Sequence, residues 1–234
     1  CRRITAALRE LGLELGSLTA ILITHTHADH ISGLQTLLKR CAAPVFTTER
    51  AARELSWRLP GAETRLDALD FGIPQSIGEF AVTAFPTSHD APGSCGFRLD
   101  AAGGAVGVLT DTGYVTDEAA DILEGVDLAV LEANHDIETL RSGPYPYYLK
   151  QRILGAQGHL SNEDAARFAA VLAQSGTSEI ILAHLSRENN TPAMAQTAVE
   201  RALSAAGVSP LLSVAPRDCL GPAHTVSRRS VCRR

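Results

Sequence analysis

The sequence predicts a single domain of mixed α/β or α+β class. Short apolar runs that end in polar residues alternate with amphipathic stretches, which is typical of strands interleaved with helices that cover a sheet. A length of 234 residues with 45% hydrophobic content is enough for one buried core. We find no internal repeat, low-complexity segment or linker that would divide the chain.

The expected elements follow from local patterns. The apolar runs predict strands at residues 20–24, 45–47, 80–85, 95–99, 105–110, 128–132, 179–183 and 211–214. Helices are expected over residues 2–11, closed by Gly12, and after Ser32, Thr48, Thr116, Ser161 and Thr191. Ser161 with Asp164 has the pattern of a capping box, and Pro192 suits a first helical position. Residues 141–158, rich in Pro and Gly at their start, are predicted to form a long loop.

Composition excludes several classes of protein. A net charge of −5 argues against binding nucleic acid through a diffuse basic surface. No apolar run approaches the roughly eighteen residues needed to cross a bilayer, so we expect a soluble protein with no membrane partner. The odd number and irregular spacing of the cysteines argue against a disulfide framework and favour a reducing cytoplasm. The sequence does not indicate an oligomeric state.

The segment His25-Thr26-His27-Ala28-Asp29-His30 carries the strongest chemical signal. His25 and His27 follow a predicted strand, where side chains two residues apart project to one side. Asp29 and His30 come after the turn, at the threshold of a helix, and can face a second point nearby. This clustering predicts two adjacent metal ions, because packing alone gives no reason to place three imidazoles beside a carboxylate.

Three further residues stand just beyond predicted strands. They are His89, Asp111 and His184. Each alone could be a structural histidine or a turn aspartate, but their common position at strand ends favours a shared site. Imidazole and carboxylate ligands without thiolate suit Zn²⁺ best and also accept Mn²⁺ or Fe²⁺.

The chain resembles the metallo-β-lactamase superfamily through this His/Asp segment, Ser88-His89-Asp90, Thr110-Asp111-Thr112-Gly113 and Ala183-His184-Leu185. The resemblance implies an α+β fold, a four-layer αββα sandwich with the site at one edge of the sheets. It also implies that one metal is held by His25, His27 and His89. The second would be held by Asp29, His30 and His184, with Asp111 bridging the two.

More narrowly, four segments resemble the YycJ/WalJ group, DNA 5′ exonucleases related to RNase Z and RNase J. They are residues 132–136, 143–146, 158–162 and 184–190. Relatives open with strands that do not precede Cys1 here, so we expect an N-terminally incomplete copy that lacks its first strands. Residues 1–222 are predicted to form the hydrolase domain, and residues 223–234 a basic, flexible tail.

Two residues are candidates for catalysis. In such a site two divalent cations lower the pKa of a shared water, and Asp29 can orient the resulting hydroxide while it also binds metal. His159 precedes a predicted helix start, where it could protonate a departing oxygen or could simply cap the loop. Asp90 is either a carboxylate that fixes an imidazole tautomer or an exposed loop acid.

Substrate contacts are predicted at His135, His159, Ser161 and Arg187, with a phosphate docked near the helix start after Ser161. Lys150 and Arg152 could add charge, although isolated basic residues on loops are usually only solvated. For His135 the alternative is a structural loop histidine.

Three functional hypotheses remain. The first is a phosphodiesterase or exonuclease that acts on nucleic acid through a metal-activated hydroxide. The second is a small-molecule thioester or lactone hydrolase, which the metal site alone does not separate from the first. The third is a catalytically silent binding module, against which the full set of metal ligands argues.

Overall fold

Two β-sheets lie at the centre of the computed structural model, which describes residues 1–226. The smaller sheet is parallel and runs in the order β1 (Ile21–Leu22), β2 (Val45–Thr48), β3 (Leu66–Leu69). The larger sheet is mixed and runs in the order β10 (Leu211–Val214), β9 (Glu179–Ala183), β8 (Leu128–Glu132), β7 (Gly104–Leu109), β6 (Cys95–Ala101), β5 (Phe80–Pro86), β4 (Gln75–Ile77).

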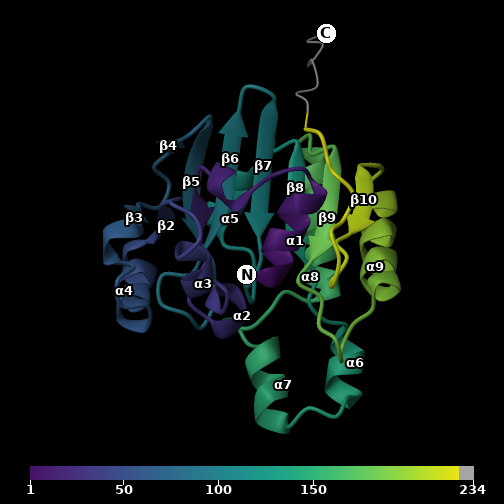
Figure 1. Ribbon diagram of the computed structural model, residues 1–234. Coiled ribbons are helices and arrows are strands. Elements are labelled where there is room, and N and C mark those ends of the chain that lie inside the picture. The colour runs from purple at the N-terminus through teal and green to yellow at the C-terminus, as the bar shows by residue number, and fades with distance from the viewer. Residues whose placement is uncertain (227–234) are drawn as a thin grey trace.

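Helices cover the outer faces of both sheets (Figure 1). Those beside the smaller sheet are α2 (Ala28–Ile31), α3 (Leu34–Leu38) and α4 (Glu49–Arg58). Those on the larger sheet are α5 (Asp117–Leu123), α8 (Asn162–Gln174) and α9 (Pro192–Ala205). The remaining helices are α1 (Arg2–Glu10), α6 (Ile137–Ser142), α7 (Tyr147–Leu154) and the short 3-10 turns Leu15–Ser17 and Glu63–Arg65. Of these, α6 and α7 project from one end of the body.

Buried clusters show how the layers are held together. Between the sheets, Phe46 of β2 and Leu69 of β3 pack with Val82 of β5 and Phe97 of β6. On the outer face of the smaller sheet, residues of β2 pack against Leu55 of α4 and its neighbours. The order helix, sheet, sheet, helix confirms the predicted four-layer αββα sandwich.

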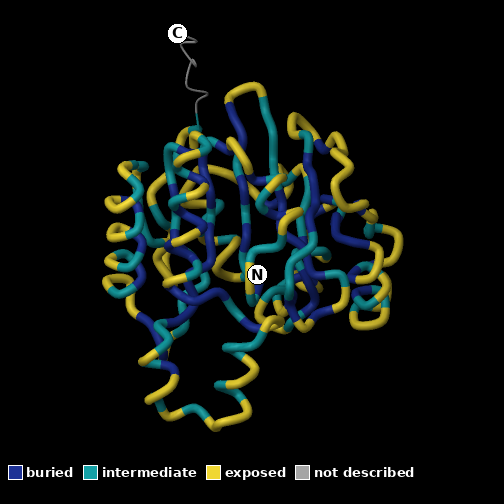
Figure 2. Tube along the Cα trace, turned by 180° about the vertical axis from the view of Figure 1, so that it is seen from behind, coloured by how far each residue is buried: buried dark blue, intermediate teal, exposed yellow. Residues whose placement is uncertain are grey.

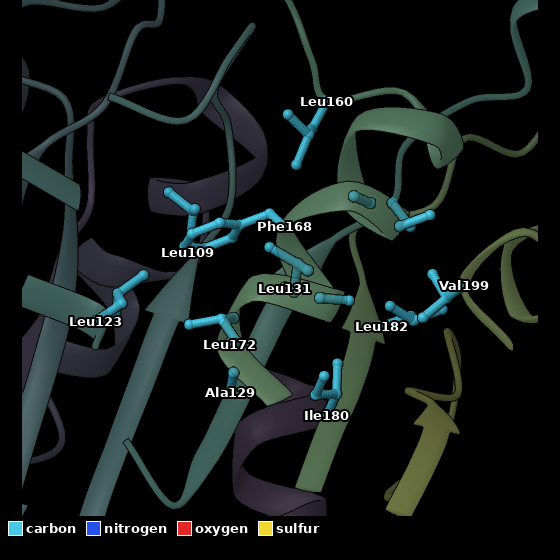
Figure 3. Close-up of a cluster of buried hydrophobic side chains, with 14 of the residues drawn as sticks. Leu109, Leu123, Ala129, Leu131, Leu160, Phe168, Leu172, Ile180, Leu182 and Val199 are labelled. Atoms are coloured by element: carbon cyan, nitrogen blue, oxygen red, sulfur yellow. The ribbon is translucent and has the colours of Figure 1, made fainter. Parts of the chain in front are cut away.

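The largest cluster lies between the seven-stranded sheet and its helices (Figure 3). Leu131 of β8 and Leu182 of β9 meet Phe168 and Leu172, which are one turn apart on α8. Each fully buried side chain of this size contributes about 1.5–3 kcal/mol. This cluster fixes α8 against the strands whose ends carry the site.

Most predicted elements are confirmed. Strands β8, β9 and β10 have the predicted bounds, and the other predicted strands differ at their ends, β1 being the shortest. The side chains of Thr48, Thr116, Ser161 and Thr191 each cap the helix that follows, by accepting a backbone N–H three residues ahead. Gly12 follows α1 with φ of 73°, as expected for a helix end.

The loop predicted for residues 141–158 is wrong in part. The Gly143-Pro144-Tyr145-Pro146 stretch is irregular, but it is followed by α7, whose first residue comes directly after Pro146. The short strands β3 and β4 were not predicted, because four and three residues are too few for an apolar pattern to mark a strand. The domain division at residue 222 stays a prediction, and residues 227–234 of the proposed tail lie outside the described residues.

No helix within residues 1–226 has both the length and the apolar content needed to cross a lipid bilayer.

Candidate metal centre

The site is built where four strands of the larger sheet end. Strands β7, β8 and β9 are mutually parallel, and β5 runs the same way because both β5 and β7 are antiparallel to β6. Their carboxyl ends therefore share one edge. That edge carries His89 after β5, Asp111 after β7, Glu132 at the end of β8 and His184 after β9.

The first predicted ligand group is assembled as expected. His25 and His27, which follow β1 of the smaller sheet, meet His89 so that one ring nitrogen from each lies within 4.8 Å of the others. His89 Nδ1 donates to Gly158 O at 3.0 Å, which leaves Nε2 of that ring free of its proton in the neutral form. His25 is fully buried, and its Nε2 has no hydrogen-bond partner among the described residues.

The second predicted group also converges. Asp29 and His30, both on α2, lie with His184 so that one ligand atom from each is within 4.8 Å of the others. His30 Nδ1 is 3.3 Å from Thr24 Oγ1, and His184 Nδ1 donates to Glu132 Oε1 at 2.8 Å. Because Nδ1 of each ring is engaged elsewhere, Nε2 of each faces the centre of the group.

Asp111 lies between the two groups. Its Oδ2 is 3.4 Å from His30 Nε2, and its Oδ1 is 3.4 Å from His184 Nε2 and 3.8 Å from His89 Nε2. The residue is only 2% exposed. One carboxylate thus reaches histidines of both groups, which is the geometry of a bridging ligand.

The backbone is strained at two of these positions. Among the described non-glycine residues, Asp111 and His184 have positive φ angles, 59° and 58°. Asp and His tolerate this region better than most residues, but it remains unfavourable. Each residue follows a strand directly or after one residue, so the left-handed turn redirects its side chain toward the site.

Glu132 is a candidate site residue that sequence reasoning missed. Its carboxylate is completely buried, and Oε1 accepts hydrogen bonds from Nδ1 of both His159 and His184, each at 2.8 Å. Its Oε2 accepts from the backbone N–H groups of Thr112 at 3.1 Å and Leu160 at 3.2 Å. The signal was available, since a glutamate ends an apolar strand at the edge that carries Asp111 and His184.

The electrostatics of the site favour a neutral His25 and an ionised Asp111. Burial, reinforced by the neighbouring His30, lowers the pKa of His25 to about 3. Burial would raise the pKa of Asp111, but the nearby imidazoles of His30 and His184 lower it overall. For His184, burial alone would lower the pKa, but Glu132 and Asp111 raise it to about 9. Buried ionised carboxylates of this kind are stabilised by cations.

The donor set fits divalent metal ions. It consists of imidazole nitrogens and carboxylate oxygens without thiolate, a combination suited to Zn²⁺ and also accepted by Mn²⁺. His25 Nε2 and Asp111 Oδ2 are buried without hydrogen-bond partners, and such orphaned atoms are expected where an ion is to be bound.

A cavity of about 470 Å³ opens over this centre. Ligand candidates form its floor, and α7 with the segment after it forms one wall through Leu149, Arg152, Ile153 and Gln157. His159, which precedes α8, also lines the cavity, with its Nδ1 3.8 Å from Asp111 Oδ1. Asp90 is near both His27 and His89, at 3.5 and 3.6 Å from their Nε2 atoms, and Oδ2 accepts from Arg152 Nε at 2.6 Å.

Three of the predicted substrate contacts lie outside the lining of this cavity. Ser161 is buried and caps α8. His135 is buried, with a pKa lowered to about 4 mainly by burial, and its carbonyl accepts from Asn162 N–H. Arg187 is exposed, with Nη2 3.5 Å from Asp218 Oδ1. Their roles toward a substrate stay predictions.

The chain belongs to the β-lactamase superfamily. The family model described as "Beta-lactamase superfamily domain" matches residues 3–185. This confirms the predicted superfamily, and it covers every predicted metal ligand from His25 to His184.

Two curated relatives show which group within this superfamily the chain is similar to. The chain is 38% identical over 208 residues to the exodeoxyribonuclease WalJ of Streptococcus pneumoniae, covering 88% of this chain and 77% of that protein. It is 35% identical over 205 residues to the exodeoxyribonuclease YycJ of Bacillus anthracis, with 86% and 77% covered. The resemblance to the YycJ/WalJ group is therefore confirmed.

Solved structures agree on the fold. The metallo-β-lactamase fold protein YhfI from Bacillus subtilis superposes with a TM-score of 0.65 at 20% identity, over 86% of this chain and 76% of that one. Zn²⁺-bound PqqB from Methylobacterium extorquens gives a TM-score of 0.59 at 18% identity, over 84% and 70%. At these identities the likeness concerns the fold alone.

Proposed function

We propose that this protein is a metal-dependent exodeoxyribonuclease that uses two divalent cations, Zn²⁺ in the first place and Mn²⁺ as the alternative. The observation that carries the proposal is the position of Asp111 between two groups of ligand atoms on the floor of a cavity. The names of the WalJ and YycJ relatives support DNA as the substrate class.

The ligand assignment follows the two groups. His25, His27 and His89 would hold one ion, and Asp29, His30 and His184 the other, with Asp111 shared. Bound there, two cations supply Lewis-acid chemistry, in that they withdraw charge from a phosphodiester and lower the pKa of water. Asp29, the exposed member of the set, lines the cavity, which supports the proposal that it would orient the attacking water.

His159 is proposed as the proton donor to the leaving oxygen. Glu132 accepts the Nδ1 proton, so Nε2 is the ring nitrogen left to exchange a proton in the cavity. His159 thus acts on the substrate, whereas Glu132 orients the ring from behind.

A phosphodiester suits this site better than a neutral carbonyl does. The negative charge on its non-bridging oxygens is attracted by two cations. Its leaving oxygen needs an acid such as His159. The acidic net charge of the chain means that binding depends on these local contacts, which predicts a shallow salt dependence.

The test is a hydrolysis panel. Protein loaded with Zn²⁺ or with Mn²⁺ is given 5′-labelled single- and double-stranded DNA, RNA, a thioester and a lactone, with Asp111→Asn as the control for contaminating nucleases. We expect metal-dependent release of nucleotides from DNA by the wild type only. Turnover of the thioester or lactone without nucleotide release would favour the small-molecule hydrolase, and no turnover at all would favour a silent binding module.

We further propose that the protein works in the reducing cytoplasm. The described cysteines Cys1, Cys41, Cys95 and Cys219 are free thiols, and Cys41 and Cys95 are buried. Free buried thiols persist where disulfides do not form. Cell fractionation with detection of the native protein tests this placement.

A further inference from the structure

Residues 137–154, comprising α6, the Gly143-Pro144-Tyr145-Pro146 stretch and α7, form an arm that extends from the body of the molecule (Figure 1). Most of the arm is exposed or half-buried (Figure 2). At the start of α7 stand Tyr147 and Tyr148, whose exposed fractions are 77% and 73%. Two adjacent aromatic rings left this open to solvent are unusual for surface residues without a partner.

The arm is continuous with the proposed active site. Tyr145, Leu149 and Arg152 line the cavity over the metal centre. Tyr148 lies one helical turn before Arg152, so the two share a side of α7. Arg152 in turn donates to Asp90 at 2.6 Å, beside His27 and His89. Tyr148 therefore lies on the side of α7 that carries Arg152, and Tyr147 is its neighbour in the chain.

The charge of this segment differs from that of the whole chain. The arm contains three basic residues, Arg141, Lys150 and Arg152, and one acidic residue, Glu138, although the chain carries a net charge of −5. Arg141 is paired with Glu138 at 3.1 Å and Arg152 with Asp90 at 2.6 Å. A local excess of basic groups beside aromatic rings matches a phosphate backbone with bases attached. Proteins that bind single-stranded nucleic acid combine these two features.

We propose that Tyr147 and Tyr148 form a stacking platform for the unpaired bases of a single DNA strand whose end enters the cavity. The proposal rests on the proposed nuclease function and adds strandedness to it. An aromatic ring can stack only on a base face that is not already covered by neighbouring base pairs. The cavity, about 470 Å³, is in the size range of pockets for small ligands and so takes a strand end.

The experiment measures binding without depending on hydrolysis. Fluorescence anisotropy of the metal-loaded protein is recorded with two labelled, phosphorothioate-linked oligomers of about twelve units, one of thymidines and one of abasic sites with the same backbone. Tyr147→Ala/Tyr148→Ala is compared with Tyr147→Phe/Tyr148→Phe, which keeps the rings. Phe80→Ala is the matched control, because Phe80 is an exposed aromatic residue at the end of β5 opposite to His89.

We expect the alanine pair to weaken binding of the thymidine oligomer roughly ten-fold or more, which is the value of stacking one base. Binding of the abasic oligomer should be unchanged, and the phenylalanine pair and Phe80→Ala should bind both as the wild type does. Equal binding of the thymidine oligomer by the alanine pair and the wild type would overturn the platform, even if DNA is hydrolysed. A wild-type dimer that dissociates in the alanine pair would assign the rings to a second copy of this chain and also overturn it. Failure of the nuclease function itself appears separately, in the hydrolysis panel.

Discussion

Glu132 Oε1 accepts the Nδ1 proton of His159 at 2.8 Å from a position with no exposure to solvent. The same oxygen accepts the Nδ1 proton of His184 at 2.8 Å. One buried carboxylate therefore orients both the proposed proton donor and a proposed metal ligand. This shared support means that the two functions of the site are separable by mutation at the histidines but not at Glu132.

Replacement of Glu132 should impair both functions. The native carboxylate only accepts hydrogen bonds, whereas the amide nitrogen of Glu132→Gln only donates. That nitrogen must therefore face other donors, either Nδ1–H of His159 and His184 or the backbone N–H groups of Thr112 and Leu160. We expect turnover to fall at least 10²-fold and metal affinity to fall about 10- to 100-fold. Steady-state kinetics and competition with a chelator measure the two effects. A variant with wild-type metal affinity would show that the contact with His184 is dispensable.

His159→Ala should separate the two functions. His159 is proposed to face the leaving group and lies outside the two proposed ligand groups, although it lies beside Asp111, Glu132 and His184. We therefore expect turnover to fall about 10²- to 10⁴-fold with the metal content intact. The measurement is kcat on DNA beside elemental analysis of the same preparation. Loss of metal from this variant would place His159 among the ligands and make the proposed ligand set wrong.

Removing a proposed metal ligand should lower the metal content as well as the activity, unlike His159→Ala. We expect metal-replete wild-type protein to hold two equivalents of metal, and His184→Ala and Asp111→Asn to hold fewer and to be inactive while remaining folded. Asp117→Asn, an exposed carboxylate in the first turn of α5, is the control and should keep both metals. Elemental analysis and circular dichroism provide the readouts. Full activity of the wild type at one equivalent would refute the dinuclear centre.

A buried amide network should dominate local stability near the site. Asn190 Nδ2 donates to Ala133 O and to Asn162 Oδ1, each at 2.8 Å, and so joins the segment after β8 to the start of α8. Asn190→Ala leaves these buried acceptors unsatisfied, and we expect the free energy of unfolding to fall by about 1–3 kcal/mol per lost partner. Gln196→Ala, whose side chain bonds only to Glu200 on α9, should change it by less than about 0.5 kcal/mol. Urea denaturation of both variants checks the difference, and equal midpoints would contradict it.

Strand ends are visible in the sequence, and this is how the candidate ligands could be named from it. An apolar run followed by His or Asp marks a place where a buried strand leaves the sheet, and parallel strands bring such places together. This reasoning located His89, Asp111 and His184. Glu132 was missed because it belongs to the strand itself, and only the structure shows that its side chain is buried against two imidazoles.

The remaining differences have local causes. Helix α7 follows a Gly-Pro-Tyr-Pro stretch, and the irregularity predicted for that stretch was wrongly extended to residues 147–154, which are helical and form one wall of the cavity. Strands β3 and β4 have only four and three residues, so their pairing with β2 and β5 depends on neighbours that lie elsewhere in the chain. Arg187 carries charge near the site in sequence, but in space it faces Asp218.

The left-handed backbone at Asp111 and His184 implies a trade-off between stability and function. A glycine at either position would relieve about 1–2 kcal/mol of conformational strain, whereas the native side chains keep it. Selection for stability alone would therefore remove the two side chains that join the proposed metal ions to the sheet. Keeping them at this edge lowers the stability of the fold in favour of the proposed chemistry. Variants selected for stability without an activity screen should therefore accumulate changes at these two positions.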